Sequence, residues 1–393
     1  MSPPSDAGAA PRRSLIVSGS IGQGHASVAE VCADALAGAG GTCSVVDAMA
    51  LLGSSASLAG ERVFRRMLRI APLYDALHFS QLRAGTALAD AMDRAATRRL
   101  VPRLRRQVEA FAPDLLVAVF ATGAGALARL RPELPGVPTV VVCTDASAHR
   151  LWVHPGIDRY LVFSDVAAGT VRQYQPGADV VRIAPAVRGA FYAAPSRHQA
   201  RQALGAAAND DAAPWVLLSA GGWGGAPLER LARAVAAAGC KVLAVAGRSQ
   251  ELEQRLQRAA GTFPAGPAGP GRSAGAGRSG LAAGPGIVPF GYSDRMPELM
   301  AAADVVVTTA GQTCHEARVV GRPLVLLDAV PGHGRENLLL ELAHGGALAC
   351  RAEPGAVRAA VESVLAGEVP PGRPWPIASP DQWHRQLLAA LPR

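Results

Sequence analysis

The feature that most constrains the fold is a series of short apolar runs separated by amphipathic segments. Each run is rich in Val, Ile and Leu, and segments such as 26–37 and 227–237 between the runs have apolar residues on one helical face. The runs are 15–18, 43–47, 115–120, 139–143, 160–163, 180–183, 215–219, 241–246, 287–290, 304–308 and 323–328. Strands buried on both faces and joined by crossover helices form parallel sheets. The pattern therefore predicts two doubly wound α/β halves.

Changes in composition indicate how the chain is divided. Residues 14–190 and 214–368 contain the two series of runs, and residues 191–213 carry the proline, asparagine and aspartate turn signals of a linker. Residues 261–286 are almost entirely glycine, proline, alanine, serine and arginine, which indicates a disordered low-complexity insertion. The remaining residues are expected to be a disordered N-terminus, 1–13, and a tail laid over a surface, 369–393.

Composition excludes several classes of protein. A chain of 393 residues with 49% hydrophobic residues can form a core in each half. The six cysteines are scattered and never form a CxxC pair, which favours neither a structural zinc site nor a secreted disulfide framework. The apolar run after Arg13 is too short for a signal peptide, and no stretch approaches the roughly 18–20 apolar residues of a membrane span. A cytoplasmic location is the expectation.

A glycine-rich corner, SGSIGQGHAS, follows the first predicted strand. Gly22 and Gly24 allow the backbone to approach a ligand closely, and His25 stands where the next helix begins. The spacing is GxxGxG, which differs from the dinucleotide pattern GxGxxG, and the corner lacks the Lys-Ser/Thr of a P-loop. Ligands of parallel sheets bind beyond the carboxyl ends of the strands. His25 is therefore a candidate general base or acceptor ligand, or it only closes the start of a helix.

Two similar corners follow strands of the second half. Ser219-Ala-Gly-Gly-Trp-Gly-Gly225 can direct peptide N–H groups at a diphosphate, unless it is only a flexible loop. In Thr308-Thr-Ala-Gly-Gln-Thr-Cys-His-Glu316, Thr313 can cap a helix and contact a phosphate. Glu316, one turn further on, can accept two hydroxyl hydrogen bonds from a ribose, or it is an ordinary capping carboxylate.

Together these motifs resemble the monogalactosyldiacylglycerol synthase and diacylglycerol glucosyltransferase family, which is related to the cell-wall lipid-intermediate N-acetylglucosaminyltransferases. The resemblance extends over about residues 14–368. Its second-half motifs are 291–300 (GYSDRMPELM), Ala303-Asp304, Ala310-Gly311, Thr313, Glu316-Ala317, Gly321-x-Pro323 and Pro331-Gly332 with Asn337. Its first-half motifs are Gly22-Gln-Gly-His25, Thr144-Asp145, His149-x-x-Trp152-x-His154 and Val187-Arg188.

The resemblance implies the GT-B architecture, in which two Rossmann-like domains face a cleft and the second domain holds a UDP-sugar donor. The implied donor contacts are Arg188, Ser219, Gly221, Gly222, Arg248, Phe290, Gly291, Tyr292, Gln312, Thr313, Glu316, Glu336 and Asn337. Among them the backbone at 290–292 would meet uracil, and Glu316 the ribose. The implied acceptor contacts are Gly22, Gly24, His149, Trp152 and His154. From the residues alone, Trp152 is equally typical of a core side chain, and Arg248 of a surface ion pair.

The reaction implied by the resemblance is direct displacement at the anomeric carbon with inversion. Either His25 or Asp145 would be the base, and Asp145 has the alternative of a helix N-cap. The family needs no metal for turnover, and this chain has no Asp-x-Asp pair to hold a cation on a diphosphate. Arginine and helix amides would neutralise the leaving group instead. We therefore expect no metal and no cofactor besides the UDP-hexose substrate.

Positive charge is concentrated in residues 61–107, where eleven arginines oppose four acidic residues, a local net charge of +7. Val63-Phe64 and Met67-Leu68 alternate with arginines at helical spacing, as in helices that lie on anionic membranes, although an ordinary helix covering a core gives the same pattern. Nucleic acid is a poorer interpretation because no recognised binding motif accompanies the charge. Peripheral association with the inner face of the plasma membrane is the expectation.

The leading hypothesis is a metal-independent, inverting glycosyltransferase that moves a hexose from a UDP-sugar to a lipid acceptor such as diacylglycerol. Three alternatives stay open at this stage: a UDP-sugar 2-epimerase of the same architecture, a glycosyltransferase acting on a small apolar metabolite, and a noncatalytic sugar-nucleotide or lipid-binding protein. The sequence identifies neither the hexose nor the acceptor.

Overall fold

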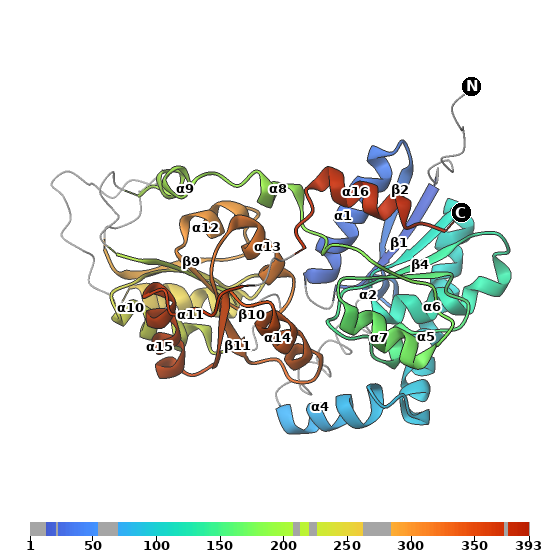
Figure 1. The fold of residues 1–393 in the computed structure, drawn as a ribbon, viewed down its shortest axis with the longest axis horizontal. Helices are drawn as coiled ribbons and strands as arrows, with labels where there is room; N and C mark the ends of the chain where they lie inside the picture. Colours follow the sequence, from blue (N-terminus) through green and yellow to red (C-terminus); the bar gives the residue numbers. More distant parts are fainter. Residues whose placement is uncertain are drawn as a thin grey trace. The chain divides into compact units, whose positions relative to one another are not determined.

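The structure is a computed structural model that describes residues 13–20, 23–53, 70–206, 213–219, 226–261, 284–372 and 376–392. The chain divides into two compact units, the first comprising Met1–Arg188 and Pro376–Arg393 and the second Gly189–Trp375 (Figure 1). Each unit contains a sheet of six parallel strands with helices on both faces. This is the doubly wound α/β architecture that the apolar runs predict.

The first sheet has the strand order β2-β1-β3-β4-β5-β6. Its strands are β1 (Arg13–Ser18), β2 (Thr42–Asp47), β3 (Leu115–Ala118), β4 (Thr139–Cys143), β5 (Arg159–Val162) and β6 (Val180–Arg182). Strands β3 and β4 are buried along their whole length, which explains why they are apolar without alternation. Strand β1 stands second in the order, with β2 on one side and β3 on the other, so the chain winds outward from it in both directions.

Helices cover the two faces of this sheet with separate cores. Residues of α5, α6 and α7 pack on one face, and residues of α1 and α16 pack on the other (Figure 1). The helical segments are α1 (Gly24–Gly38), α2 (Ala48–Leu51), α4 (Ala71–Leu77), the π-helical η1 (His78–Leu82), α5 (Ala87–Phe111), α6 (Ala121–Leu130), the 3₁₀ turns η2 (Arg131–Glu133) and η3 (Arg150–Trp152), α7 (Asp165–Tyr174) and α16 (Pro380–Ala389).

The second sheet has the strand order β12-β11-β10-β7-β8-β9. Its strands are β7 (Trp215–Ser219), β8 (Lys241–Val245), β9 (Gly286–Phe290), β10 (Val305–Thr309), β11 (Leu324–Asp328) and β12 (Ala347–Arg351). Its helices are α8 (Gly189–Tyr192), α9 (Arg197–Ala203), α10 (Leu228–Ala237), α11 (Gln250–Ala260), α12 (Met296–Ala302), α13 (Gln312–Val320), α14 (His333–Ala343) and α15 (Pro354–Leu365). Helices α10, α11 and α15 share one core with the strands, and α12 and α13 lie on the opposite face (Figure 1).

All eleven apolar runs of the sequence are strands, with ends that differ by a few residues at most. The twelfth strand, β12, was not predicted. Its sequence, ALACR, contains no β-branched residue, and only part of it is buried because it forms an edge of the sheet. Tertiary pairing with β11, and not local preference, makes this segment a strand.

The structure adds detail to two segments of the sequence analysis, the linker and the tail. Residues 191–213, expected to be a linker with one helical patch, contain α9, in which Arg201 is buried and donates from Nε to the Ala302 carbonyl at 3.0 Å. The tail, expected to lie over a surface, forms α16, in which Trp383 is 2% exposed and donates from Nε1 to the Ala184 carbonyl at 2.8 Å. The chain therefore returns to the core of the first unit at its end.

Within the described part of the chain, no helix combines the length and the apolar composition needed to cross a membrane. Three predictions lie wholly or largely outside the described residues. They are the disordered N-terminus, 1–13, the low-complexity insertion, 261–286, and the amphipathic helix with Val63-Phe64 and Met67-Leu68.

Candidate functional site

The carboxyl end of the first sheet brings three sequence-distant segments to one edge. The parallel register sets Val17, Ala118 and Val141 level with one another, so the residues that follow β1, β3 and β4 are neighbours. The chain reverses its winding direction between β1 and β3. Crevices for ligands form at such switch points because the helices that follow the two strands lie on opposite faces.

His25 lies at this switch point, in the first turn of α1. Its Nδ1 is 2.8 Å from the Val119 carbonyl oxygen and 3.1 Å from Thr144 Oγ1. Its ring meets the Phe120 ring edge-on at a centroid distance of 5.2 Å. Because a carbonyl oxygen only accepts hydrogen bonds, Nδ1 carries the proton, and the basic lone pair of the neutral ring is on Nε2. This tautomer suits a general base.

Close packing explains one glycine of this corner. A Cβ atom on Gly19 would lie 2.5 Å from the Phe120 ring, so any larger residue would displace the ring against which His25 packs. Gly24 is the first residue of α1, whereas Gly22 lies outside the described residues.

Asp145 follows β4 and holds the loop that carries the predicted acceptor residues. Its Oδ2 accepts a hydrogen bond from Trp152 Nε1 at 2.7 Å and lies 3.7 Å from His149 Nε2. The Trp152 ring is 1% exposed and lies 6.2 Å from the His25 ring. His154 is also buried, and its Nε2 donates to the Leu151 carbonyl at 2.8 Å. Of the three side chains expected to touch an acceptor, Trp152 is 1% exposed, His154 7% and His149 12%, so His149 is the most exposed of them.

Two residues that pack on this loop were missed from the sequence. The ring of His78, from η1, meets the His149 ring edge-on at 5.9 Å, and Tyr74, from α4, stacks on His78 at 6.2 Å. Burial and then the Asp145 carboxylate raise the pKa of Tyr74, so its hydroxyl keeps its proton. The available signal was their i,i+4 spacing, which puts both rings on one face of a helical segment.

The carboxyl end of the second sheet gathers the predicted donor residues. The register aligns Phe290, Val245, Ser219, Thr308 and Leu326 across five neighbouring strands. The winding direction reverses between β7 and β10, directly beside Ser219 and Thr308. The corners after these strands therefore meet at one edge, as the sequence predicts. Gly221 and Gly222, in the corner after Ser219, lie outside the described residues.

Helix α13 begins at this edge. Gly311 is its N-cap, and Thr313 lies inside the first turn, which corrects the prediction that Thr313 caps the helix. Gln312 is the first helical residue, and Glu316 is buried one turn further on. The amide groups of the first turn and the positive end of the helix dipole therefore face the edge of the sheet.

Residues after β8 and β9 form a small cluster at the same edge of the sheet. The Arg248 guanidinium lies 5.2 Å from the centre of the Tyr292 ring, and Tyr292 is 61% exposed. Gly291 is fixed by packing, since a Cβ there would lie 2.7 Å from a Glu253 carboxylate oxygen. The Phe290 carbonyl accepts a hydrogen bond from the Ala246 amide at 2.8 Å. The structure thus gives Arg248 a contact with an aromatic ring, and its expected roles, a diphosphate contact or a surface ion pair, stay predictions.

A buried ion pair joins α13 to α14. Arg318 donates from Nε to Glu341 Oε2 at 3.0 Å and from Nη1 to the Gly345 carbonyl at 3.0 Å. Glu341 is buried, and burial raises the pKa of its carboxyl group although Arg318 opposes the shift. The pair joins the last turns of the two helices, whereas Glu336 and Asn337 lie in the first two turns of α14.

Arg188, a predicted diphosphate contact, belongs to the first unit and not to the corners that follow β7 to β11. The sequence analysis expected no metal ion at either edge, and this stays a prediction. Within the described ranges, no group of three His, Cys, Asp or Glu side chains has an arrangement that could hold a metal ion.

Comparison with protein families agrees with the motifs. Residues 25–176 match the family model of monogalactosyldiacylglycerol (MGDG) synthase, and residues 271–347 match that of the glycosyltransferase family 28 C-terminal domain. The resemblance inferred from the sequence is therefore confirmed. The first match begins at His25 and includes the whole of the loop that follows Asp145.

Individual relatives are distant. A processive diacylglycerol beta-glucosyltransferase of Bacillus pumilus (strain SAFR-032) is 26% identical over 244 residues, which cover 60% of this chain and 56% of the relative. A probable chloroplastic monogalactosyldiacylglycerol synthase 2 of Oryza sativa subsp. japonica is 29% identical over 219 residues, 52% of this chain and 41% of the relative. The chain thus spans about half the length of these curated relatives.

Solved structures share the fold. Acinetobacter baumannii MurG has a TM-score of 0.50 with 15% identity, covering 96% of this chain and 94% of the other. S. aureus MnaA, solved with UDP, has a TM-score of 0.54 with 13% identity, covering 97% and 91%. At this identity the likeness shows the fold alone. The two Rossmann-like domains are those of the GT-B fold.

His315 of α13, which faces Glu341 of α14, gives a prediction about pH. Burial, and then Arg318, lower the pKa of His315, and the Glu341 carboxylate 3.6 Å away is already paired with Arg318. Below about pH 6.5 the unfolded chain binds a proton that the folded chain excludes, so the free energy of unfolding falls as the pH decreases. Between pH 8 and pH 5 the wild type should lose about 2 kcal/mol more than His315→Gln in urea titrations.

The matched control is His198→Gln, because His198 is exposed on α9. This variant should show the same pH dependence as the wild type. Identical pH profiles for His315→Gln and the wild type would contradict the buried, neutral state of His315.

Proposed function

We propose that this protein is a glycosyltransferase that moves a hexose from a UDP-sugar to a lipid acceptor such as diacylglycerol. The observation that carries the proposal is the position of His25 at the switch point of the first sheet, within a segment that matches the MGDG synthase model. The relatives named as diacylglycerol glucosyltransferase and monogalactosyldiacylglycerol synthase support a lipid acceptor.

The edge of the second sheet is proposed to bind the donor. Peptide N–H groups at the start of α13 suit a diphosphate, as the glycine-rich sequence after Ser219 also suggests, and Glu316 suits the ribose hydroxyls. The 290–292 backbone is proposed to meet uracil, and Glu336 and Asn337 the sugar. The description of the S. aureus MnaA structure as a complex with UDP is consistent with such a donor in this fold.

We propose His25, and not Asp145, as the base. Asp145 is already engaged by the Trp152 N–H, and its other near neighbour is His149. His25 has its Nδ1 proton directed at the Val119 carbonyl, which puts the basic lone pair on Nε2. We therefore assign the base to His25, and we assign Asp145 to holding the loop.

The proposed reaction is a single displacement. An acceptor hydroxyl oxygen attacks the anomeric carbon, and His25 Nε2 takes the hydroxyl proton. The bond between that carbon and the β-phosphate oxygen breaks, and its electron pair leaves with UDP, which inverts the anomeric configuration. Helix amides and Arg248 are proposed to stabilise the charge on the departing diphosphate without a metal ion.

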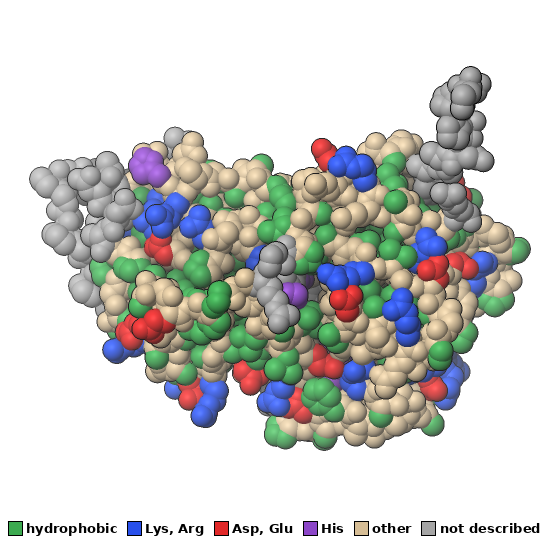
Figure 2. Space-filling model, viewed as in Figure 1, with side chains coloured by type: hydrophobic (Ala, Val, Ile, Leu, Met, Phe, Trp, Pro, Cys, Tyr) green, Lys and Arg blue, Asp and Glu red, His purple; other side chains and the backbone are tan. Residues whose placement is uncertain are grey.

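The helices α4, η1 and α5 supply a surface suited to a membrane. Four of their large apolar residues are 44–58% exposed: Ile70, just before α4, and Leu73, Phe79 and Leu88. Figure 2 shows hydrophobic side chains beside basic ones where Figure 1 draws α4. Arginines 94, 98, 99, 103 and 106 are exposed along α5. Apolar side chains flanked by cations favour an anionic bilayer, so we propose peripheral association with the inner face of the plasma membrane.

A transfer assay tests the function directly. The full chain is incubated with UDP-glucose, UDP-galactose or UDP-N-acetylglucosamine and vesicles containing diacylglycerol, and the products are identified by mass spectrometry. A glycosylated lipid is expected, with kcat about 10²–10⁴-fold lower for His25→Ala than for the wild type. An altered free sugar nucleotide without lipid product would identify an epimerase instead. No product from any donor, or full activity of His25→Ala, would refute the transferase or its assigned base.

Replacement of Glu316 tests the donor site. Glu316→Ala should weaken UDP binding, measured by calorimetry, by about 1–3 kcal/mol because a ribose hydroxyl loses its charged acceptor. Glu316→Gln retains an acceptor oxygen and should lose less. Glu362→Ala, an exposed carboxylate on α15, is the control and should bind UDP like the wild type. Unchanged affinity of Glu316→Ala would exclude the ribose contact.

Cosedimentation with vesicles tests the membrane surface. Leu73→Asp should weaken binding to vesicles of phosphatidylcholine and phosphatidylglycerol about tenfold or more, because burial of a leucine is worth about 1.5–3 kcal/mol. Leu339→Asp is the matched control, since Leu339 is 66% exposed on α14 of the second unit. Equal binding of both variants would show that this helical surface does not contact the bilayer.

A further inference from the structure

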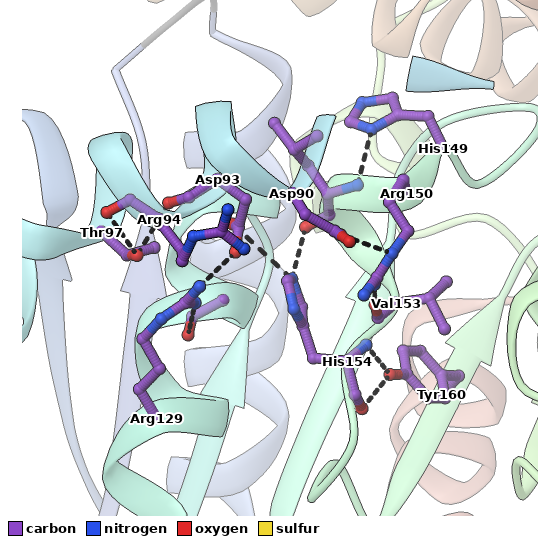
Figure 3. A network of polar contacts seen from close by, with 12 residues as sticks. Asp90, Asp93, Arg94, Thr97, Arg129, His149, Arg150, Val153, His154 and Tyr160 are labelled. Atoms are coloured by element: carbon purple, nitrogen blue, oxygen red, sulfur yellow. Dashed lines mark hydrogen bonds and ion pairs between the residues drawn. The ribbon is translucent and has the colours of Figure 1, made fainter. Parts of the chain in front are cut away.

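The loop between β4 and β5, residues 144–158, carries Asp145, His149 and Trp152 but has little regular structure of its own. Its only helical element is the three-residue turn η3. Side chains from helices outside the loop hold it in place, and Figure 3 shows the main network. The position of the proposed acceptor residues therefore depends on contacts with those helices.

The first link joins α5 to Arg150. Arg150 Nε lies 3.0 Å from Asp90 Oδ1, and Arg150 also donates from Nη1 to the Val153 carbonyl (Figure 3). Arg150 thus contacts its own loop through Val153 and helix α5 through Asp90. The side chains of this pair are 24% and 39% exposed. Such an ion pair contributes little to stability, and it restricts the geometry of the groups that it joins.

The second link lies deeper in the same network. Asp93, one helical turn after Asp90, accepts a hydrogen bond on Oδ2 from Arg129 Nη2 at 2.6 Å (Figure 3). Its Oδ1 lies 3.9 Å from His154 Nε2, too far for a hydrogen bond, so the link to His154 is a packed polar contact between side chains that are each 7% exposed. Burial lowers the pKa of His154, although Asp93 opposes the shift, so the ring is neutral near pH 7.

Close packing against α6 restricts the position of the Asp93 carboxylate. A Cβ at Gly125 of α6 would lie 2.6 Å from Asp93 Oδ1, so only glycine at 125 admits the carboxylate here. His154 is fixed on its other side, because its amide donates to the Tyr160 hydroxyl at 2.9 Å and its carbonyl accepts from it at 3.0 Å. A buried carboxylate is costly unless it is paired, so a well-ordered arrangement of this kind serves geometry more than stability.

Arg150 and His154 flank Trp152 in the sequence, and Trp152 in turn donates to Asp145. Anchors on both sides of the indole therefore determine the position of the ring relative to His25, at the 6.2 Å centroid distance described above. On this basis we propose that Asp90 and Asp93 are positioning residues: through Arg150 and His154 they hold the His149–Trp152 segment against α5 in the geometry that receives the acceptor. This inference rests on the proposed function of the loop.

Hydrogen exchange measured by mass spectrometry tests these contacts of Asp90 and Asp93 with the loop, called the tether below, without relying on catalytic activity. Several loop amides have defined acceptors, among them the Trp152 amide, which donates to the His149 carbonyl at 2.9 Å. In Asp90→Asn, Arg150→Gln and Asp93→Asn, exchange in peptides covering 144–154 should be about fivefold faster or more than in the wild type. Gly125→Ala should act in the same direction with every charged group retained. Unchanged exchange in all four variants would overturn the tether.

The chain offers a matched control and a rescue. Glu133→Gln breaks an ion pair of the same helix, since Arg105 Nη2 lies 2.6 Å from Glu133 Oε1, but neither residue contacts the loop network drawn in Figure 3. Its loop exchange should equal that of the wild type. The charge reversal Asp90→Arg with Arg150→Asp restores the pair in the opposite sense, so it should recover slower exchange than either single variant. Failure of this rescue would argue against the ion pair as the tether.

Kinetics separate positioning from mere structural support. Asp90→Asn and Asp93→Asn should raise the KM for the lipid acceptor about fivefold or more, while UDP affinity stays within twofold of the wild type, because the loop belongs to the first unit. Faster exchange with an unchanged acceptor KM would refute the positioning role. If the wild type makes no lipid product, the proposed function fails, and the exchange data by themselves decide whether the tether exists.

Discussion

The parallel register of the two sheets is the constraint on which the rest of the molecule depends. Parallel pairing aligns the carboxyl ends of neighbouring strands, and the reversal of winding beside β1 and beside β7 separates the helices that follow. One edge thereby gathers His25, Val119 and Thr144, and another gathers Ser219 and Thr308. No single corner would be a site by itself, because each supplies only one or two of the groups that meet at its edge.

Buried polar contacts convert these edges into defined geometries. The Asp145–Trp152 hydrogen bond and the Arg318–Glu341 pair both lie where hydration is largely lost. Leaving either partner unpaired there would cost more than an exposed pair gains, so alternative arrangements of the same helices are penalised. In the first unit the Asp145–Trp152 contact fixes residues near His25, and in the second unit the Arg318–Glu341 pair fixes α13 relative to α14.

The strands were predictable from the sequence because burial on both faces leaves a continuous apolar run. The exception, β12, lies at an edge and owes its conformation to β11. The corners with His25, Ser219 and Glu316 were also predictable, since glycines and polar residues directly after a buried strand are typical of the edge at which parallel sheets bind ligands. Tyr74 and His78 were not: they come from a helical segment far from β4 in the chain, and only packing brings them to His149.

The sequence by itself determined the two α/β units, the strand ends at which the candidate residues gather and the resemblance to lipid glycosyltransferases, because these follow from local burial patterns and from motifs at strand ends. The tertiary structure decided what each candidate side chain contacts. It directed the Nδ1 proton of His25 to a carbonyl, used Asp145 to hold Trp152, buried His154 against Asp93, and returned the tail to the first unit as α16. Contacts between residues far apart in the chain depend on helix packing, which no local pattern encodes.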